Sequence, residues 1–258
     1  KINMHEIILL FVGLIVGVLN SIAGGGMLLG FPVLIATGLT PIVANATTSL
    51  IVLPGQATSV FGYRKYLKTV PKRYMLMLIP CFIGGLIGAS LLESTPSDKF
   101  SELVPFLIFM AVVLFAFQPF LYRHLHRHLH GPAKHRKRIQ PLIIMAIAML
   151  PISIYGGYFG AGYGFIMLAL YGFTKIHEVH KIAGMKNLSV IAVALASLIV
   201  LWNSGLINWH DGLIMGVGTA IGGYSGAMVS QKISSHSVRV IVIVVGLCAA
   251  IFLGLKSF

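Results

Sequence analysis

Three consecutive glycines inside an apolar stretch constrain this chain more than any other feature. Gly24-Gly-Gly26 follows the apolar run Ile7 to Ala23 and precedes a short apolar piece, Met27 to Thr37. Glycine loses more backbone entropy on ordering than other residues, so a glycine triplet interrupts an α-helix. Within hydrocarbon, interrupted backbone is stable only where protein buries it or where it lines a polar cavity. The triplet therefore predicts a broken helix in the protein-lined interior of a membrane.

A second glycine-rich break occurs later in the chain, in Tyr155-Gly-Gly-Tyr-Phe-Gly-Ala-Gly-Tyr-Gly-Phe165. The segments at the two breaks are also alike. Gly30-Phe-Pro-Val-Leu-Ile-Ala-Thr-Gly-Leu-Thr40 aligns without a gap with Gly164-Phe-Ile-Met-Leu-Ala-Leu-Tyr-Gly-Phe-Thr174. Glycine-interrupted segments in corresponding positions of two halves are typical of transporter binding sites.

The composition is that of a membrane protein. Of 258 residues, 57% are hydrophobic and 10% are charged, against about 25% charged in a soluble domain. Most of the net charge of +13 lies between apolar runs, where Lys and Arg set topology and contact lipid headgroups; nucleic-acid binding is not expected. We predict an all-α polytopic protein with spanning helices at 42–62, 74–92, 103–120, 182–202, 212–230 and 238–255.

A long polar segment divides the chain. Residues 122–140 are predicted to be a basic, His-rich cytoplasmic linker between a first repeat at 1–121 and a second repeat at 141–258. Histidines alternate through Arg123-His-Leu-His-Arg-His-Leu-His130. Because no Cys, Asp or Glu is nearby, we interpret this run as a solvated loop at anionic lipid rather than a metal site.

Lysine and arginine bias sets the orientation. The 63–73 loop has five basic residues and no acid, so it is expected in the cytoplasm, whereas 93–102 has three acids and one Lys and is expected outside. Residues 7–37 and 141–173 have two interpretations, a full crossing or a hairpin that enters and returns. The hairpin interpretation agrees better with the Lys and Arg distribution. It also makes the two halves inverted repeats, each with one hairpin and three spans. The first run is about 17 residues, long for a half crossing, so both interpretations stay open.

Three motifs together resemble the sulfite exporter TauE/SafE family of membrane permeases. They are the break Ala23-Gly-Gly-Gly26, the segment from Gly38-Leu-Thr-Pro41 to Ala44-Asn-Ala-Thr-Thr-Ser49, and the second break Gly160-Ala-Gly-Tyr-Gly164. The resemblance covers nearly the whole chain. It implies a multi-pass protein of the bacterial inner membrane that moves small anions, chiefly sulfite, sulfonates such as sulfoacetate, and related oxyanions. Some members handle carboxylates, so the substrate is not fixed.

The second repeat departs from the first in one place. Lys186-Asn-Leu-Ser189 stands where the first half has Thr47-Thr-Ser49, which predicts unequal roles for the halves. An intramembrane lysine is costly and usually functional, so Lys186 is a candidate partner of a permeating anion. The alternative is that its long side chain snorkels to the cytoplasmic headgroups.

Each break creates a helix N-terminus, where unpaired N–H groups and a partial positive charge favour anions. Hydroxyl and amide groups near these ends would complete the replacement of the anion's hydration shell. The alternatives are close helix packing for the glycines, own-backbone bonding for Thr and Ser, and packing or interfacial roles for the tyrosines. The candidate substrate-binding residues are Asn20, Ser21, Gly24, Gly25, Gly26, Asn45, Thr48, Tyr158, Gly160, Gly162, Tyr163, Lys186 and Asn187.

The sequence also narrows the class of function. No phosphate-binding glycine loop or nucleophile–base arrangement lies in the spans, so we expect neither ATP hydrolysis nor an enzyme, and no cofactor or metal. Cys81 and Cys248 are interpreted as small core residues. All six acids lie in loops or at run ends, which leaves both proton coupling and a potential-driven uniport open. A secondary transporter is favoured, and an anion channel with the same broken-helix filter is the alternative. The oligomeric state is not predicted.

Overall fold

The computed structural model describes residues 3–111, 113, 141–172, 174, 176 and 178–230. The linker at 122–140, the last expected span and part of the 103–120 span lie outside the described residues. Within the described chain all regular structure is helical, and residues 97–111 are helical as well. The other helices are α1 (Met4–Ile22), α2 (Met27–Ala36), α3 (Pro41–Gly62), α4 (Arg64–Leu67), η1 (Lys72–Met77), α5 (Leu78–Glu93), α7 (Pro141–Tyr158), α8 (Tyr163–Tyr171), α9 (Val179–Leu201) and α10 (Trp209–Val229).

Local sequence explains where several helices begin and end. Helix α3 begins at Pro41, whose fixed φ suits the first helical position. Helix α10 begins at Trp209 because the Asn208 side chain accepts a hydrogen bond from the Asp211 N–H at 3.0 Å. The expectation that this span begins at 212 is therefore wrong by three residues.

Four described helical segments are long and apolar enough to cross a membrane: Met4–Ile22, Lys72–Glu93, Val179–Leu201 and Trp209–Val229. Helix α3 has 22 residues but is more polar, and its Asn45, Thr47 and Gln56 are buried. It therefore turns polar groups toward protein. The all-α, multi-pass membrane class expected from the sequence is confirmed at this level.

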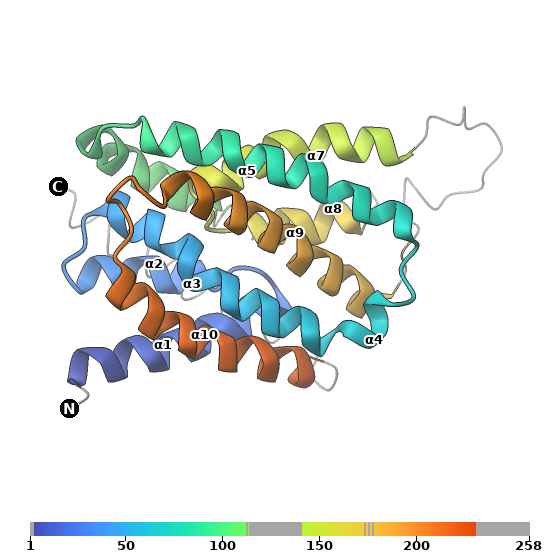
Figure 1. Cartoon of the computed structure of the whole chain (residues 1–258), viewed down its shortest axis with the longest axis horizontal. Helices are drawn as coiled ribbons and strands as arrows, with labels where there is room; N and C mark the ends of the chain where they lie inside the picture. Colours follow the sequence, from blue (N-terminus) through green and yellow to red (C-terminus); the bar gives the residue numbers. More distant parts are fainter. Residues whose placement is uncertain are drawn as a thin grey trace.

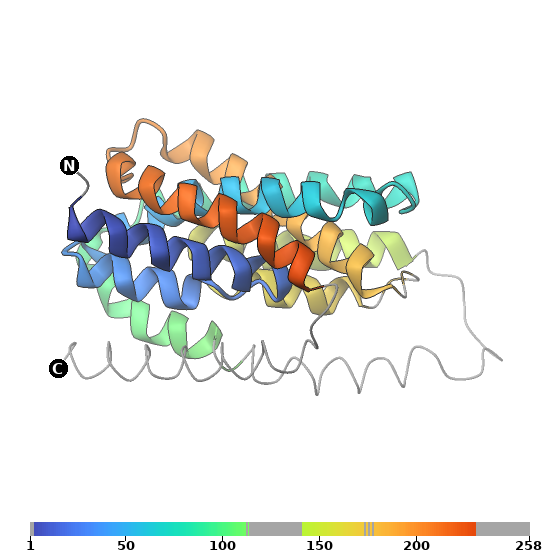
Figure 2. The same cartoon turned by 90° about the horizontal axis from the view of Figure 1, so that it is seen from below.

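The long helices form a row in the order α1, α10, α3, α9, α5, α7, with each helix packed against the next (Figure 1). Helices α3 and α9 lie at the centre of the row. Helix α2 packs on α3 and α8 packs on α9, and Figure 2 shows both on the same side of the row.

The helices on either side of each glycine break run in opposite directions. Helix α1 starts at one end of the molecule and α2 returns to it, whereas α7 and α8 do the same from the other end (Figure 1). The turn between α9 and α10 lies at the end where α1 starts, and α4 lies at the opposite end with the starts of α7 and α9 (Figure 1). The expected outside and cytoplasmic loops are thus separated to opposite ends.

Glycines bring the outer helices of the row into backbone contact. In α1 and α10, a Cβ on Gly17 would lie 2.4 Å from the Thr219 oxygen, and a Cβ on Gly222 would lie 2.0 Å from the Leu14 oxygen. In α5 and α7, a Cβ on Gly88 would lie 2.1 Å from the Ile154 oxygen. Small residues that permit such approach are typical of membrane helix interfaces. These two pairs are therefore fixed closely together.

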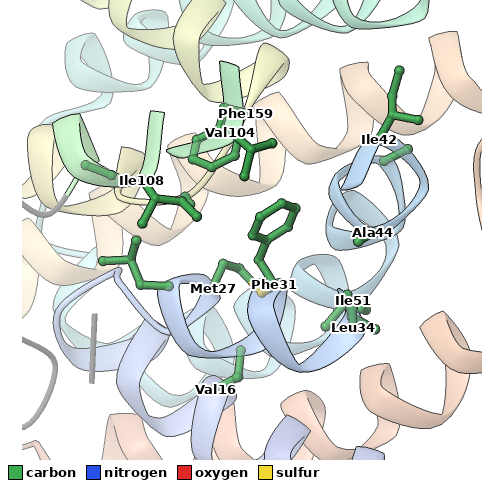
Figure 3. Close-up of a cluster of buried hydrophobic side chains, with 14 of the residues drawn as sticks. Val16, Met27, Phe31, Leu34, Ile42, Ala44, Ile51, Val104, Ile108 and Phe159 are labelled. Atoms are coloured by element: carbon green, nitrogen blue, oxygen red, sulfur yellow. The ribbon is translucent and has the colours of Figure 1, made fainter. Parts of the chain in front are cut away.

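An aromatic and aliphatic core joins the two breaks. Phe31 of α2 meets Phe159, just after α7, edge to face with ring centroids 5.5 Å apart. Figure 3 shows both rings among Met27, Val104 and Ile108, all of which are buried. The start of α2 and the end of α7 therefore share one packed cluster.

Candidate functional site

The two glycine breaks meet each other inside the molecule. A Cβ on Gly24 would lie 2.7 Å from the Gly164 Cα, and a Cβ on Gly25 would lie 1.8 Å from the Phe165 ring. Gly24 has φ +95, which side chains with a Cβ rarely adopt. These glycines are thus required for close packing, as the packing interpretation proposed. That packing places the starts of α2 and α8 next to one cavity.

The second break turns through two left-handed glycines. Gly160 has φ +74 and Gly162, the residue before α8, has φ +80. Because only glycine adopts this region without strain, the pair lets the chain reverse within a few residues.

A cavity of about 40 Å³ lies between the breaks and the central helices. This volume holds a few water molecules or one small anion. Residues at helical spacing on α3 and α9 form two of its walls, and the breaks supply the rest. Its lining residues are Asn20, Gly24, Met27, Thr48, Ser49, Val52, Gln56, Gly156, Gly160, Tyr163, Gly164, Val190, Val193, Ala194 and Ser197.

Free backbone donors stand at both breaks. Met27 and Gly164 line the cavity, and their N–H groups have no hydrogen-bond partner within the described part of the chain. The same holds for the N–H groups of Gly25 and Gly162. Apart from the Gly25 N–H, which lies one residue before the cap of α2, these are the unsatisfied donors at the starts of α2 and α8, where the helix dipole is positive. Two such ends at one cavity favour an anion.

Gln56 adds an unpaired amide to the cavity wall. Its side chain is buried, and its Oε1 has no hydrogen-bond partner among the described residues. A buried polar atom without a partner is costly. Its Nε2 also makes no hydrogen bond to a described residue, so the two N–H donors of the amide are available to an anion.

Lys186 lies behind the cavity wall. Its side chain is 0% exposed, and Nζ donates to the backbone oxygens of Asn20 at 2.5 Å and Ser21 at 3.3 Å. Both oxygens belong to the last turn of α1, where the helix dipole favours a cation. The lysine is therefore enclosed by protein and does not snorkel.

Asn20 connects this lysine to the first break. The Asn20 backbone oxygen accepts a hydrogen bond from Lys186, and its side-chain oxygen accepts one from the Gly26 N–H at 2.7 Å. Asn20 also lines the cavity. Next to it, the Ser21 hydroxyl meets that of Ser59 at 2.7 Å. Ser59 in turn accepts from Asn187 at 2.6 Å. A polar network thus runs from α9 through α3 to the end of α1.

The structure separates the predicted residues into two groups. Asn20, Gly24, Thr48, Gly160 and Tyr163 line the cavity. The others do not line it, namely Ser21, Gly25, Gly26, Asn45, Tyr158, Gly162, Lys186 and Asn187.

Several of the expected hydroxyl donors are engaged by protein. The Thr48 hydroxyl donates to the Asn45 oxygen of its own helix at 2.7 Å. The Tyr163 hydroxyl meets Ser153 at 3.3 Å, and the Tyr158 hydroxyl meets Thr95 at 3.4 Å.

Sequence reasoning missed most of the wall. The polar lining residues that it missed are Ser49, Gln56 and Ser197. It also missed Met27 and Gly164, whose backbone N–H groups are the free donors at the cavity. A signal was present in α3, where Ser49 and Gln56 stand seven residues apart on one helical face. In α9 the corresponding wall is mostly apolar, and nothing in its sequence marks it.

The profile of one protein family, described as sulfite exporter TauE/SafE, matches residues 9–253. This chain belongs to that family. The match spans both glycine breaks and the cavity between them. The resemblance found from the motifs is therefore confirmed, and the protein is a member of a family of membrane transporters.

Curated relatives have the same general description. A probable membrane transporter protein, ORF9, of Sinorhizobium sp is 26% identical over 96% of this chain and 92% of its own length. One from Haemophilus influenzae is 27% identical over 92% of this chain and 89% of its own. The probable membrane transporter protein YfcA of Escherichia coli K12 is 27% identical over 92% of this chain and 85% of its own length. No solved structure matches the chain.

Proposed function

We propose that this protein is a secondary transporter of small sulfur-containing anions in the bacterial inner membrane. Its substrates would be sulfite, sulfonates such as sulfoacetate, and related oxyanions, held in the cavity between the two breaks. One observation carries the proposal: unpartnered N–H groups of Met27 and Gly164 belong to residues that line the same cavity. The family description supports the choice of sulfite-like anions.

The chemistry of the cavity suits such an anion. A tetrahedral oxyanion can accept hydrogen bonds in several directions at once, so donors from α2, α8 and the wall of α3 can act together. Gln56 and Ser197 line the cavity, and their side chains make no hydrogen bond to any described residue. Lys186 adds positive charge behind Asn20. The site would replace hydration mainly with neutral dipoles, as is usual at helix termini.

The two halves would be inverted repeats, 1–121 and 141–258. Support comes from the row, in which α1, α10 and α3 on one side correspond to α7, α5 and α9 on the other. The two helix–break–helix units enter from opposite ends (Figure 1). In this arrangement the cavity lies at the repeat interface, near the bilayer midplane, as in other inverted-repeat transporters.

The test is a thermal-shift panel on purified protein with sulfite, thiosulfate, sulfate, sulfoacetate, taurine, acetate and chloride. A ligand that binds the native state raises the melting temperature by mass action. We expect stabilisation by sulfur oxyanions or sulfonates and a smaller response in the Gln56→Leu variant. Stabilisation by acetate alone would contradict the assignment of sulfur-containing substrates but would remain consistent with a transporter of small anions.

Flux in proteoliposomes then separates a transporter from a channel. A transporter gives saturable uptake and counterflow of labelled substrate against unlabelled substrate, whereas a channel gives conductance without counterflow. A pH-sensitive dye inside the same vesicles decides between proton-coupled and potential-driven transport.

A further inference from the structure

Each broken hairpin is capped by a side chain from the opposite half. Lys186 of α9 donates to the Asn20 and Ser21 oxygens at the end of α1. In the same way, Asn45 of α3 donates to the Tyr158 oxygen at the end of α7 at 2.8 Å. Helices α3 and α9 hold matching places at the centre of the row. The two caps therefore correspond to each other, but one is charged and the other is neutral.

This asymmetry leaves a net positive charge at the site. Where a helix ends and the next begins, the partial charges of about −0.5 and +0.5 nearly cancel in sum, so the starts of α2 and α8 supply oriented N–H donors but little net charge. The Asn45 cap adds no charge, so the Lys186 ammonium contributes a surplus of one. The cavity is thus electrostatically equivalent to a single buried cation with oriented donors in front of it.

Lys186 has no carboxylate to balance it among the described residues. The described acids lie in loops or near helix ends, and their ion pairs go to other residues. An unpaired buried charge costs several kcal/mol. A bound anion would supply the missing counter-charge. One negative charge on the anion would be stabilised by Lys186, whereas the second charge of a dianion would be buried without a partner.

We propose that Lys186 makes the cavity selective for singly charged anions over doubly charged ones. The inference rests on the proposed function and narrows its substrate class to monoanions such as hydrogen sulfite and simple sulfonates. Lys186 does not line the cavity, so it acts through Asn20 as a positioning and charge-setting residue.

The experiment titrates purified protein with methanesulfonate and with sulfate, which are tetrahedral sulfur anions of similar size and different charge. We expect the unmodified protein to bind methanesulfonate about tenfold or more tightly than sulfate. Lys186→Gln keeps a donor for the Asn20 oxygen but removes the charge. It should weaken methanesulfonate binding by about tenfold or more and abolish the preference.

Two further variants separate charge from structure. Lys181→Met removes a positive charge from the same helix, but Lys181 is partly exposed and paired with Glu178 at 2.9 Å, so both affinities should stay unchanged. Asn45→Ala breaks the other cap without changing charge. It should weaken both anions together and keep their ratio.

A preference for sulfate in the unmodified protein would overturn the inference, as would an unchanged ratio in a folded Lys186→Gln protein. If that variant does not fold, the ratio of methanesulfonate to sulfate affinity in the unmodified protein still tests the inference. Binding of anions without any charge preference would refute only the role of Lys186. Absence of binding and flux for every anion tested would refute the proposed function itself.

Discussion

Gly24 and Gly164 touch through their backbones: a Cβ on Gly164 would lie 2.6 Å from the Gly24 Cα. The two glycine breaks, far apart in the sequence, are thus held against each other at one point. The first turns of α2 and α8 take their positions from this contact. The geometry of the candidate anion site therefore depends on two residues that have no side chain.

Gly24→Ala should destabilise the protein far more than Gly38→Ala. Both glycines have left-handed backbone, with φ +95 and φ +101, so both substitutions incur about 1–2 kcal/mol of strain. Only Gly24 is also tightly packed, because no atom of the described residues lies within 4 Å of a Cβ on Gly38. Melting temperatures in detergent measure the difference. Equal shifts for the two variants would contradict the proposed backbone contact.

Replacing Gln56 should separate stability from binding. Because Gln56 Oε1 is buried without a partner in the described chain, Gln56→Leu should leave the melting temperature unchanged or raise it. The same variant should bind anions more weakly, since a donor is lost. Gln56→Glu should abolish binding by repulsion between like charges. Anion titration of both variants checks this, and full affinity in Gln56→Glu would remove Gln56 from the site.

Asn208→Ala should lower the free energy of unfolding by about 1 kcal/mol or somewhat more. The Asn208 side chain caps α10: its Oδ1 accepts from the Asp211 N–H at 3.0 Å, and its Nδ2 donates to the Asp211 carboxylate at 3.2 Å. Asn203→Ala, in the exposed part of the same loop, is the matched control and should have little effect. Denaturant or thermal unfolding of the two variants measures the cap, and indistinguishable curves would argue against it.

Single cysteines should report the orientation of the two ends. In a background with Cys81 and Cys248 replaced, Lys68→Cys is expected to be protected from a membrane-impermeant thiol reagent in intact cells. Ser94→Cys is expected to react, because both positions are exposed but lie in loops assigned to opposite sides. Reaction at position 68 with protection at position 94 would show that the orientation is the opposite of the expected one.

The sequence predicts the breaks and helix limits because both depend on local backbone preferences. The glycine argument places the end of α1 before Gly24 and the end of α7 before Gly160, and the structure has them at Ile22 and Tyr158. Hydropathy placed α9 and α10 within a few residues. Helix starts were placed too late: α9 begins at Val179 instead of 182, α10 at Trp209 instead of 212, and the span expected from 103 is already helical at 97. For α10 the reason is that Asn208 begins the helix earlier than the apolar run does.

The cavity wall could not be predicted because it depends on how α3 and α9 are rotated about their axes, which long-range packing decides. Ser197 is buried in the part of α9 after Ser189, which is otherwise apolar, and no neighbouring residue marks it. The position of Lys186 was missed for a related reason. Its partners are backbone oxygens of α1, and no sequence pattern identifies a carbonyl that will need a cation.

The glycine contacts within the row also limit how the molecule can move. A shear between α1 and α10, or between α5 and α7, would drive backbone atoms into one another at Gly17, Gly222 and Gly88. Gly55 holds α3 against α10, and Gly85 holds α5 against α9, in the same way. Each trio, α1–α10–α3 and α7–α5–α9, should therefore behave as a rigid body. The seam between them, α3 against α9, carries the polar Asn187–Ser59 bond instead. Alternating exposure of the cavity would then require rocking along this one seam, whose two helices also form the cavity walls.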